Sequence, residues 1–242
     1  MTSSAWFILP LGPPDPRDTR PLRFPSAVAF IANGALLVLE LVAGRVLAPT
    51  VGVSLYTWTA VIGVVLAGIS LGSWVGGKLA DGRPSRSILS LELLLSAAAS
   101  AFVIVFQENL GSVAAPFSWP TIWQVLWLSS LVFFLPSVLI GMVTPMIIKL
   151  ALHSLDATGR VVGRIRAAGE LGAIVGVFLT GFVLISAFGT RAIVATVAIT
   201  LAVLGILSNP FWASALGRTP APAEVRSPAA TSPRGRRTKR RR

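Results

Sequence analysis

Residues 57–77 read TWTAVIGVVLAGISLGSWVGG, a run of 21 residues without a single charged side chain. As an α-helix, such a run is about 31 Å long at ~1.5 Å per residue, which matches the ~30 Å hydrocarbon thickness of a bilayer. The whole chain has the same character, since 54% of its 242 residues are hydrophobic and only 12% are charged. The run therefore predicts a membrane-spanning helix in a membrane protein.

Five further apolar segments are long enough to cross the bilayer as helices. We expect the fourth of the six spans to end or kink at Pro145, or to continue past it as far as Leu152, because proline removes a backbone donor. The sequence predicts an all-α integral membrane protein with a six-helix domain over residues 25–212. The five segments are residues 25–47, 87–106, 122–142, 167–186 and 192–208.

The two ends of the chain are unlike the spans. Residues 1–24 are rich in proline and predict an irregular arm. Residues 213–242 consist mainly of Ala, Pro, Ser and Arg, carry nine of the 21 Lys and Arg residues, and predict a disordered basic tail. The run RRTKRRR at 236–242 has the composition of a nucleic-acid patch, but a membrane topology favours contact with anionic lipid. No nucleic acid is therefore expected as a partner.

The basic residues predict the orientation of the spans. The arm, the loop after the second span, the loop after the fourth span and the tail carry three, three, four and nine Lys or Arg residues. The other side carries only Arg45 and Arg191. Because basic loops stay in the cytoplasm, both termini are expected there, with the chain in the cell's inner (plasma) membrane.

Few residues are available for soluble-enzyme chemistry. The chain has no cysteine and a single histidine, His153, so neither a thiolate site nor a histidine metal cluster can form. No phosphate-binding glycine loop and no Ser/His/Asp set is present. We therefore expect no catalytic residue, no metal and no cofactor in this chain.

Small residues recur at helical spacing in two of the spans. Gly68, Gly72 and Gly76 form one stripe, and Gly172 and Gly176 continue another. Such stripes let helix backbones approach closely, either inside one bundle or in a homodimer, and we favour the bundle.

Two of the spans also resemble each other in sequence. Residues 60–71 align without gaps on residues 173–184, with six of twelve positions identical. Because these two spans run in opposite directions, the alignment predicts a 3+3 inverted repeat like that of half a major facilitator transporter.

Glu40 lies near the middle of the first span, where a charge is costly. Asn33 shares its helical stripe, while Arg45 lies well around the helix and is expected to extend outward or to pair with another helix. Glu40 is either an ion or substrate site or a structural carboxylate held by hydrogen bonds, and Asn33 and Arg45 belong to the same candidate site.

Two other carboxylates lie closer to the predicted cytoplasmic ends of their helices. Glu170 is included in the candidate site, although a carboxylate at a helix N-terminus paired with Arg166 explains it as well. Glu92 is expected to be such a shallow, dipole-stabilised carboxylate and is not included.

The loop between the second and third spans carries a motif. Residues 76–81 read GGKLAD, with Gly77 and Asp81 followed by Arg83. This spacing of glycine, aspartate and basic residues resembles the cytoplasmic loop motif of major facilitator transporters.

Several stretches, in order over residues 25–210, resemble a known family. They are ELVAGRVLAP (40–49), GVSLYTW (52–58), residues 63–81, GMVTP (141–145) with Lys149, GRVVG (159–163) and GFVLI (181–185) with Gly189 and Thr190. The chain resembles the membrane module of spermidine synthase-like membrane proteins, also described as major facilitator/spermidine synthase fusions. In that family a cytoplasmic aminopropyltransferase-like domain follows the module.

The resemblance has limits that shape the functional hypotheses. No segment of this chain corresponds to the aminopropyltransferase domain, and Glu170 stands where the resemblance implies a small hydroxyl or amide residue. The first hypothesis is an anchor or partner module for a separate aminopropyltransferase-like chain. The second is a half-size transporter for polyamines or other cations that works as a homodimer. The third is a truncated product without activity of its own.

Overall fold

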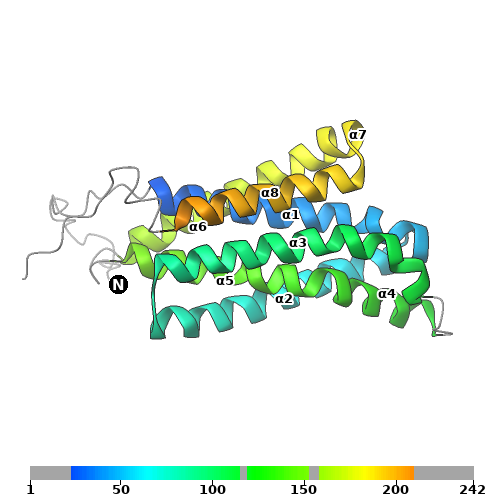
Figure 1. Ribbon diagram of the computed structural model, residues 1–242, viewed down its shortest axis with the longest axis horizontal. Coiled ribbons are helices and arrows are strands. Elements are labelled where there is room, and N and C mark those ends of the chain that lie inside the picture. Colours follow the sequence, from blue (N-terminus) through cyan, green and yellow to red (C-terminus); the bar gives the residue numbers. More distant parts are fainter. Residues whose placement is uncertain (1–22, 115–118, 153–157, 210–242) are drawn as a thin grey trace, which may run out of the picture.

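The computed structural model describes residues 23–114, 119–152 and 158–209 (Figure 1). The regular structure in these ranges is entirely helical, and six helices are long and apolar enough to cross a membrane. The prediction of six helical spans is therefore confirmed. The predicted arm lies almost wholly outside the described residues, as do the predicted tail and His153.

Two of the six spans contain a π-helical segment, η2 in the fourth and η3 in the fifth. The spans are α1 (Arg23–Val51), α2 (Leu55–Gly82), α3 (Arg86–Ala114), α4–η2–α5 (Thr121–Ser129, Ser130–Phe134 and Leu135–Ala151), α6–η3–α7 (Thr158–Leu179, Thr180–Leu184 and Ile185–Ala187) and α8 (Thr190–Ser208).

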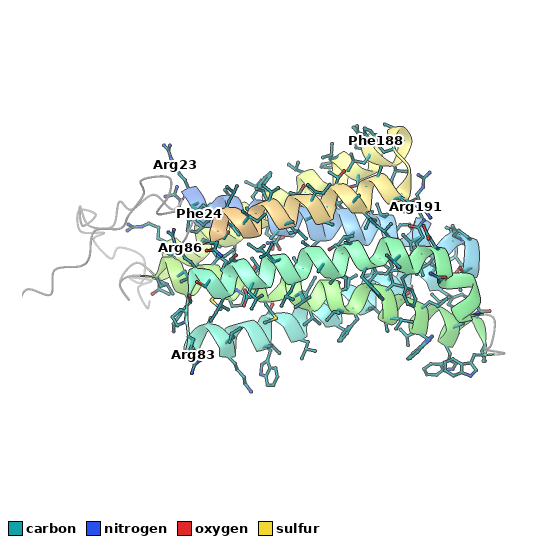
Figure 2. All side chains as sticks on the ribbon, viewed as in Figure 1. Arg23, Phe24, Arg83, Arg86, Phe188 and Arg191 are labelled. Carbon is teal, nitrogen blue, oxygen red and sulfur yellow. The ribbon has the colours of Figure 1, made fainter. Side chains whose placement is uncertain are left out.

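The spans pack mainly in three pairs: α1 with α6, α2 with α5, and α3 with α8. They run along the long axis of the molecule, with α4 and α7 at one end (Figure 1). The helix α1 is central, since 56% of the residues in its apolar stretch are buried inside the bundle. The fifth span lies at the edge, since only 22% of the residues in its apolar stretch are buried. We call the end where α1 begins and α8 ends the basic end, because exposed Arg23, Arg83 and Arg86 gather there (Figure 2).

A three-residue turn joins α1 to α2 at the opposite end of the bundle. Gly52 adopts φ +74°, a conformation that glycine reaches without steric cost. Ser54 then caps α2, since its hydroxyl accepts a hydrogen bond from the backbone N–H of Thr57 at 3.2 Å. The two residues explain why the chain can reverse so tightly between two long helices.

Most of the spans extend beyond the predicted apolar segments. One of the two largest differences is at the fifth span, where the helix begins at Thr158 instead of residue 167. Arg160, Arg164 and Arg166 are therefore helical, although the sequence placed them in a loop. The hydrocarbon limits only the apolar part of a helix, and charged residues continue it into the headgroup region.

The fourth span does not end at Pro145. The helix α5 continues through Pro145 to Ala151, as the longer alternative predicted. A spanning helix can contain a proline because groups from neighbouring helices satisfy the backbone carbonyl that the proline leaves without a donor. The irregularity lies earlier, in η2, directly before Leu135 and Pro136. Pro136 has no N–H to offer the carbonyl of Val132, and the ladder widens to π spacing at this point.

The gap-free repeat alignment does not match equivalent contacts. It pairs Gly68 with Gly181 and Gly63 with Gly176. A Cβ at Gly68 or Gly176 would lie 2.6 Å from a neighbouring helix, whereas one at Gly63 or Gly181 would meet nothing within 4 Å. The residues that the alignment pairs therefore do not occupy equivalent positions in the contacts between helices.

Candidate functional site

Asn33 and Glu40 lie on one side of α1 and are both half-buried. The Asn33 amide donates to the carbonyl of Ala29 at 2.9 Å, and its nitrogen lies 2.9 Å from where a Cβ on Gly169 of α6 would be. Further along the same helix, Gly44 packs against the ring of Trp58 in α2. This side of α1 is thus bordered by α6 near the basic end and by α2 near the opposite end.

The structure does not bring Arg45 and Glu170 together with Glu40 as one cluster of charges. Arg45 donates to the carbonyl of Ile185 in α7 at 2.8 Å, so the predicted contact with another helix is present. Glu170 is exposed, and its carboxylate lies 3.8 Å from the guanidinium of Arg166, which confirms the expected pair along α6. Of the four candidate residues, Asn33 and Glu40 share a local environment.

The glycines of the fifth span are contact points with α1. A Cβ on Gly172 would overlap the carbonyl oxygen of Phe30 and lie 2.6 Å from its carbonyl carbon. A Cβ on Gly176 would lie 2.6 Å from the carbonyl oxygen of Gly34. The two backbones therefore touch, as expected for a small-residue stripe used within the bundle.

The glycines of the second span make the same kind of contact with the fourth. Gly68 faces Ser137, Gly72 faces the carbonyl oxygen of Val138, and Gly76 faces the backbone of Met142. All three would bring a Cβ within 2.6 Å of the neighbouring helix or closer. Five glycines of the two predicted stripes therefore lie at close contacts between helices of one chain: Gly68, Gly72, Gly76, Gly172 and Gly176.

The loop motif lies at the basic end, where α2 meets α5. Asp81 accepts a hydrogen bond from the ammonium of Lys149 at 2.7 Å. Arg83 is exposed, and a Cβ on Gly77 would meet nothing within 4 Å. Asp81 therefore joins two spans, whereas Gly77 makes no close helix contact.

Glu92 differs from the sequence expectation. Its side chain is 3% exposed, and neither carboxylate oxygen has a hydrogen-bond partner. Glu92 is buried although it lies near the end of its helix, because its face of α3 packs inside the bundle instead of facing the headgroups. Ser96 and Ser100 follow Glu92 at four-residue spacing on the same face of α3, and the structure buries both of them fully.

In the part of the chain that the structure describes, the other buried side-chain atoms without a hydrogen-bond partner are single and uncharged. They are the hydroxyls of Ser129 and Thr180 and the amide oxygen of Gln107. Among the described residues, no three His, Asp or Glu side chains gather where they could hold a metal ion. Glu92 is therefore the described ionisable group whose environment is hardest to explain by packing alone.

Comparisons of the chain with protein-family models, with curated proteins and with solved structures find no match.

Proposed function

We propose that this chain is a multi-pass membrane module, resembling that of spermidine synthase-like membrane proteins, that anchors a separate aminopropyltransferase-like enzyme at its basic end. In this proposal the basic end faces the cytoplasm, as the basic loops predict. The observation that carries it is that the stretches behind the resemblance contact one another across helices. Their contacts join neighbouring helices near both ends of the bundle.

Two helix pairs illustrate these contacts. Residues 63–81 pack along α5, where Ser73 reaches the carbonyl of Gly141 at 3.5 Å and Asp81 binds Lys149. At the other end, Arg45 binds the carbonyl of Ile185. These side chains connect one helix to another, a role that suits an anchor.

Purification of the full chain from its own membranes in mild detergent should retain a soluble protein that binds decarboxylated S-adenosylmethionine. Docking at the basic end predicts that the double variant Arg83→Glu, Arg164→Glu loses this partner, because both side chains are exposed there. The matched control is Val53→Glu, which adds a charge at the exposed turn of the opposite end. Recovery of the chain alone, or equal loss in both variants, contradicts the proposal.

A second candidate is a half-size transporter for polyamines or other cations, and the pairing of the helices favours it. If spans one to three match spans four to six, the contact of α1 with α6 corresponds to that of α5 with α2, and the contact of α3 with α8 corresponds to itself. An inverted repeat related to half a major facilitator transporter would pair its helices in this way. The half-buried side of α1 with Asn33 and Glu40 would then face a second copy.

The transporter candidate predicts a dimer in lipid and a loss of cation uptake in Glu40→Gln. Removing the only carboxylate on that side of α1 should abolish binding of a cation there, while the isosteric amide preserves packing. Uptake of labelled spermidine into vesicles and subunit counting by single-molecule photobleaching measure the two effects. Glu170→Gln, at an exposed position of α6, is the control. A strict monomer, or unchanged uptake in Glu40→Gln, rules this candidate out.

A further inference from the structure

The interior of the bundle near its basic end contains one carboxyl group without a counterpart. Glu92 lies six residues after α3 begins at Arg86, which is about 9 Å along the helix axis. It is 3% exposed, and both of its oxygens lack a hydrogen-bond partner. A carboxylate that loses its hydration without gaining donors is strongly disfavoured in its charged form.

The buried hydroxyls around this part of the bundle are already used as donors. On α3, Ser96 donates to the backbone carbonyl of Glu92 at 2.7 Å, and Ser100 donates to that of Ser96 at 2.8 Å. Ser90 donates to the carbonyl of Gly205 in α8 at 2.7 Å, and Ser208 donates to the carbonyl of Leu204. None of these protons is left to stabilise a negative charge on Glu92.

The charged groups on α3 and on the helices packed against it are engaged or lie elsewhere. Lys149 of α5 binds Asp81, Arg191 of α8 binds Glu108 of α3, and Arg45 of α1 binds a backbone carbonyl. Arg86 of α3 lies over the ring of Phe24 at 5.6 Å. The remaining charged groups on the described parts of these helices are Arg23 and Glu40 of α1, and neither forms an ion pair with Glu92.

A small hollow lies at the basic end, and it is lined by a residue one helical turn from Glu92. It has a volume of about 70 Å³ and lies where the beginnings of α1 and α3 meet the end of α5. Leu89 lines it, and Leu89 and Glu92 are neighbours on one face of α3, three residues apart. Arg86 and Phe24 also line it, and both lie at the basic end of the bundle (Figure 2). The remaining lining residues are Pro25, Val28, Ile147 and Leu150.

We propose that Glu92 is a proton-binding site inside the membrane that exchanges its proton with the basic end of the bundle through this hollow. Uptake of one proton converts the carboxylate to the neutral acid, and release restores the negative charge, with no other bond made or broken. The site is independent of the proposed anchoring function. It requires only the packing of α1, α3, α5 and α8 described above.

Difference infrared spectroscopy of the full chain in lipid vesicles tests the site directly. A protonated carboxylic acid has its own carbonyl stretching band, and we expect one at neutral pH that disappears as the pH is raised. Glu92→Gln should lose this band, whereas Glu40→Gln and Glu170→Gln should retain it. Absence of the band in the unaltered chain, or its survival in Glu92→Gln, overturns the proposal.

Two further measurements distinguish a proton site from a misfolded variant and from a metal-cation site. Glu92→Asp keeps a carboxyl group, so it should keep a band that titrates with pH but lies at a shifted frequency. This shift assigns the band to position 92 even if the Glu92→Gln variant fails to fold. At constant pH the band should not respond to Na⁺ or K⁺. Displacement of the band by either ion would show a metal-cation site and overturn the assignment to a proton.

Exchange of the acid proton for deuterium tests the route. Leu150 is half-buried and lines the hollow, so Leu150→Trp should fill it and slow exchange while leaving the band in place. The control is Leu126→Trp, at an exposed position of α4. An exchange rate that is unchanged in Leu150→Trp overturns access through the hollow.

Discussion

Replacing Gly172 by alanine is expected to lower the free energy of unfolding by about 3 kcal/mol, the upper part of the range for overpacked sites. The added Cβ would overlap the carbonyl oxygen of Phe30 and lie 2.6 Å from its carbonyl carbon and 2.7 Å from its Cα. These are backbone atoms of the central helix α1, so no side chain can rotate away. Relief requires α6 to move off α1, its principal partner in the bundle.

The measurement is equilibrium unfolding in mixed micelles, with Gly163→Ala as the matched control. Gly163 is exposed on the same helix, and a Cβ there would meet nothing within 4 Å. In this position alanine should be neutral or stabilise by up to about 1 kcal/mol through its higher helix propensity. If both variants lose the same free energy, the contact between α1 and α6 is not what makes glycine necessary at position 172.

The contrast between these two glycines also shows how far the sequence predicts the fold. The six spans follow from the length of the apolar runs, and the orientation was predicted from where the basic residues fall along the chain. The stripe through Gly172 and Gly176 follows from helical spacing. That Gly163 faces away from every other helix depends on where α1 lies, which the sequence of α6 alone does not contain.

The same limit explains the two carboxylates. The position of a residue along a predicted span can be counted from the sequence. That count places Glu40 near the middle of the membrane and Glu92 near its surface. Burial depends instead on which face of the helix meets its neighbours. Glu40 lies on a side of α1 that is half-open, whereas Glu92 lies on the face of α3 that packs into the bundle. The serines that follow Glu92 mark this face, but only once it is known to be buried.

Replacing Glu92 by methionine is expected to raise the free energy of unfolding by about 1–3 kcal/mol, the cost of burying a polar group without partners. Methionine has a similar length and a flexible side chain that adapts to irregular space. The substitution removes two oxygens that have no hydrogen bonds and breaks none in return. Unfolding in mixed micelles at neutral pH measures the change.

Glu170→Met is the control, because the Glu170 side chain is 71% exposed and its pair with Arg166 is a long one at 3.8 Å. An exposed substitution of this kind should change stability by less than about 0.5 kcal/mol. A loss of stability in Glu92→Met would mean that the carboxyl group contributes to folding through contacts that its geometry does not provide. A gain would mean that the chain is less stable with the carboxyl group than without it, which is typical of groups retained for function. Proton exchange at Glu92 is the function that its burial and the nearby hollow support.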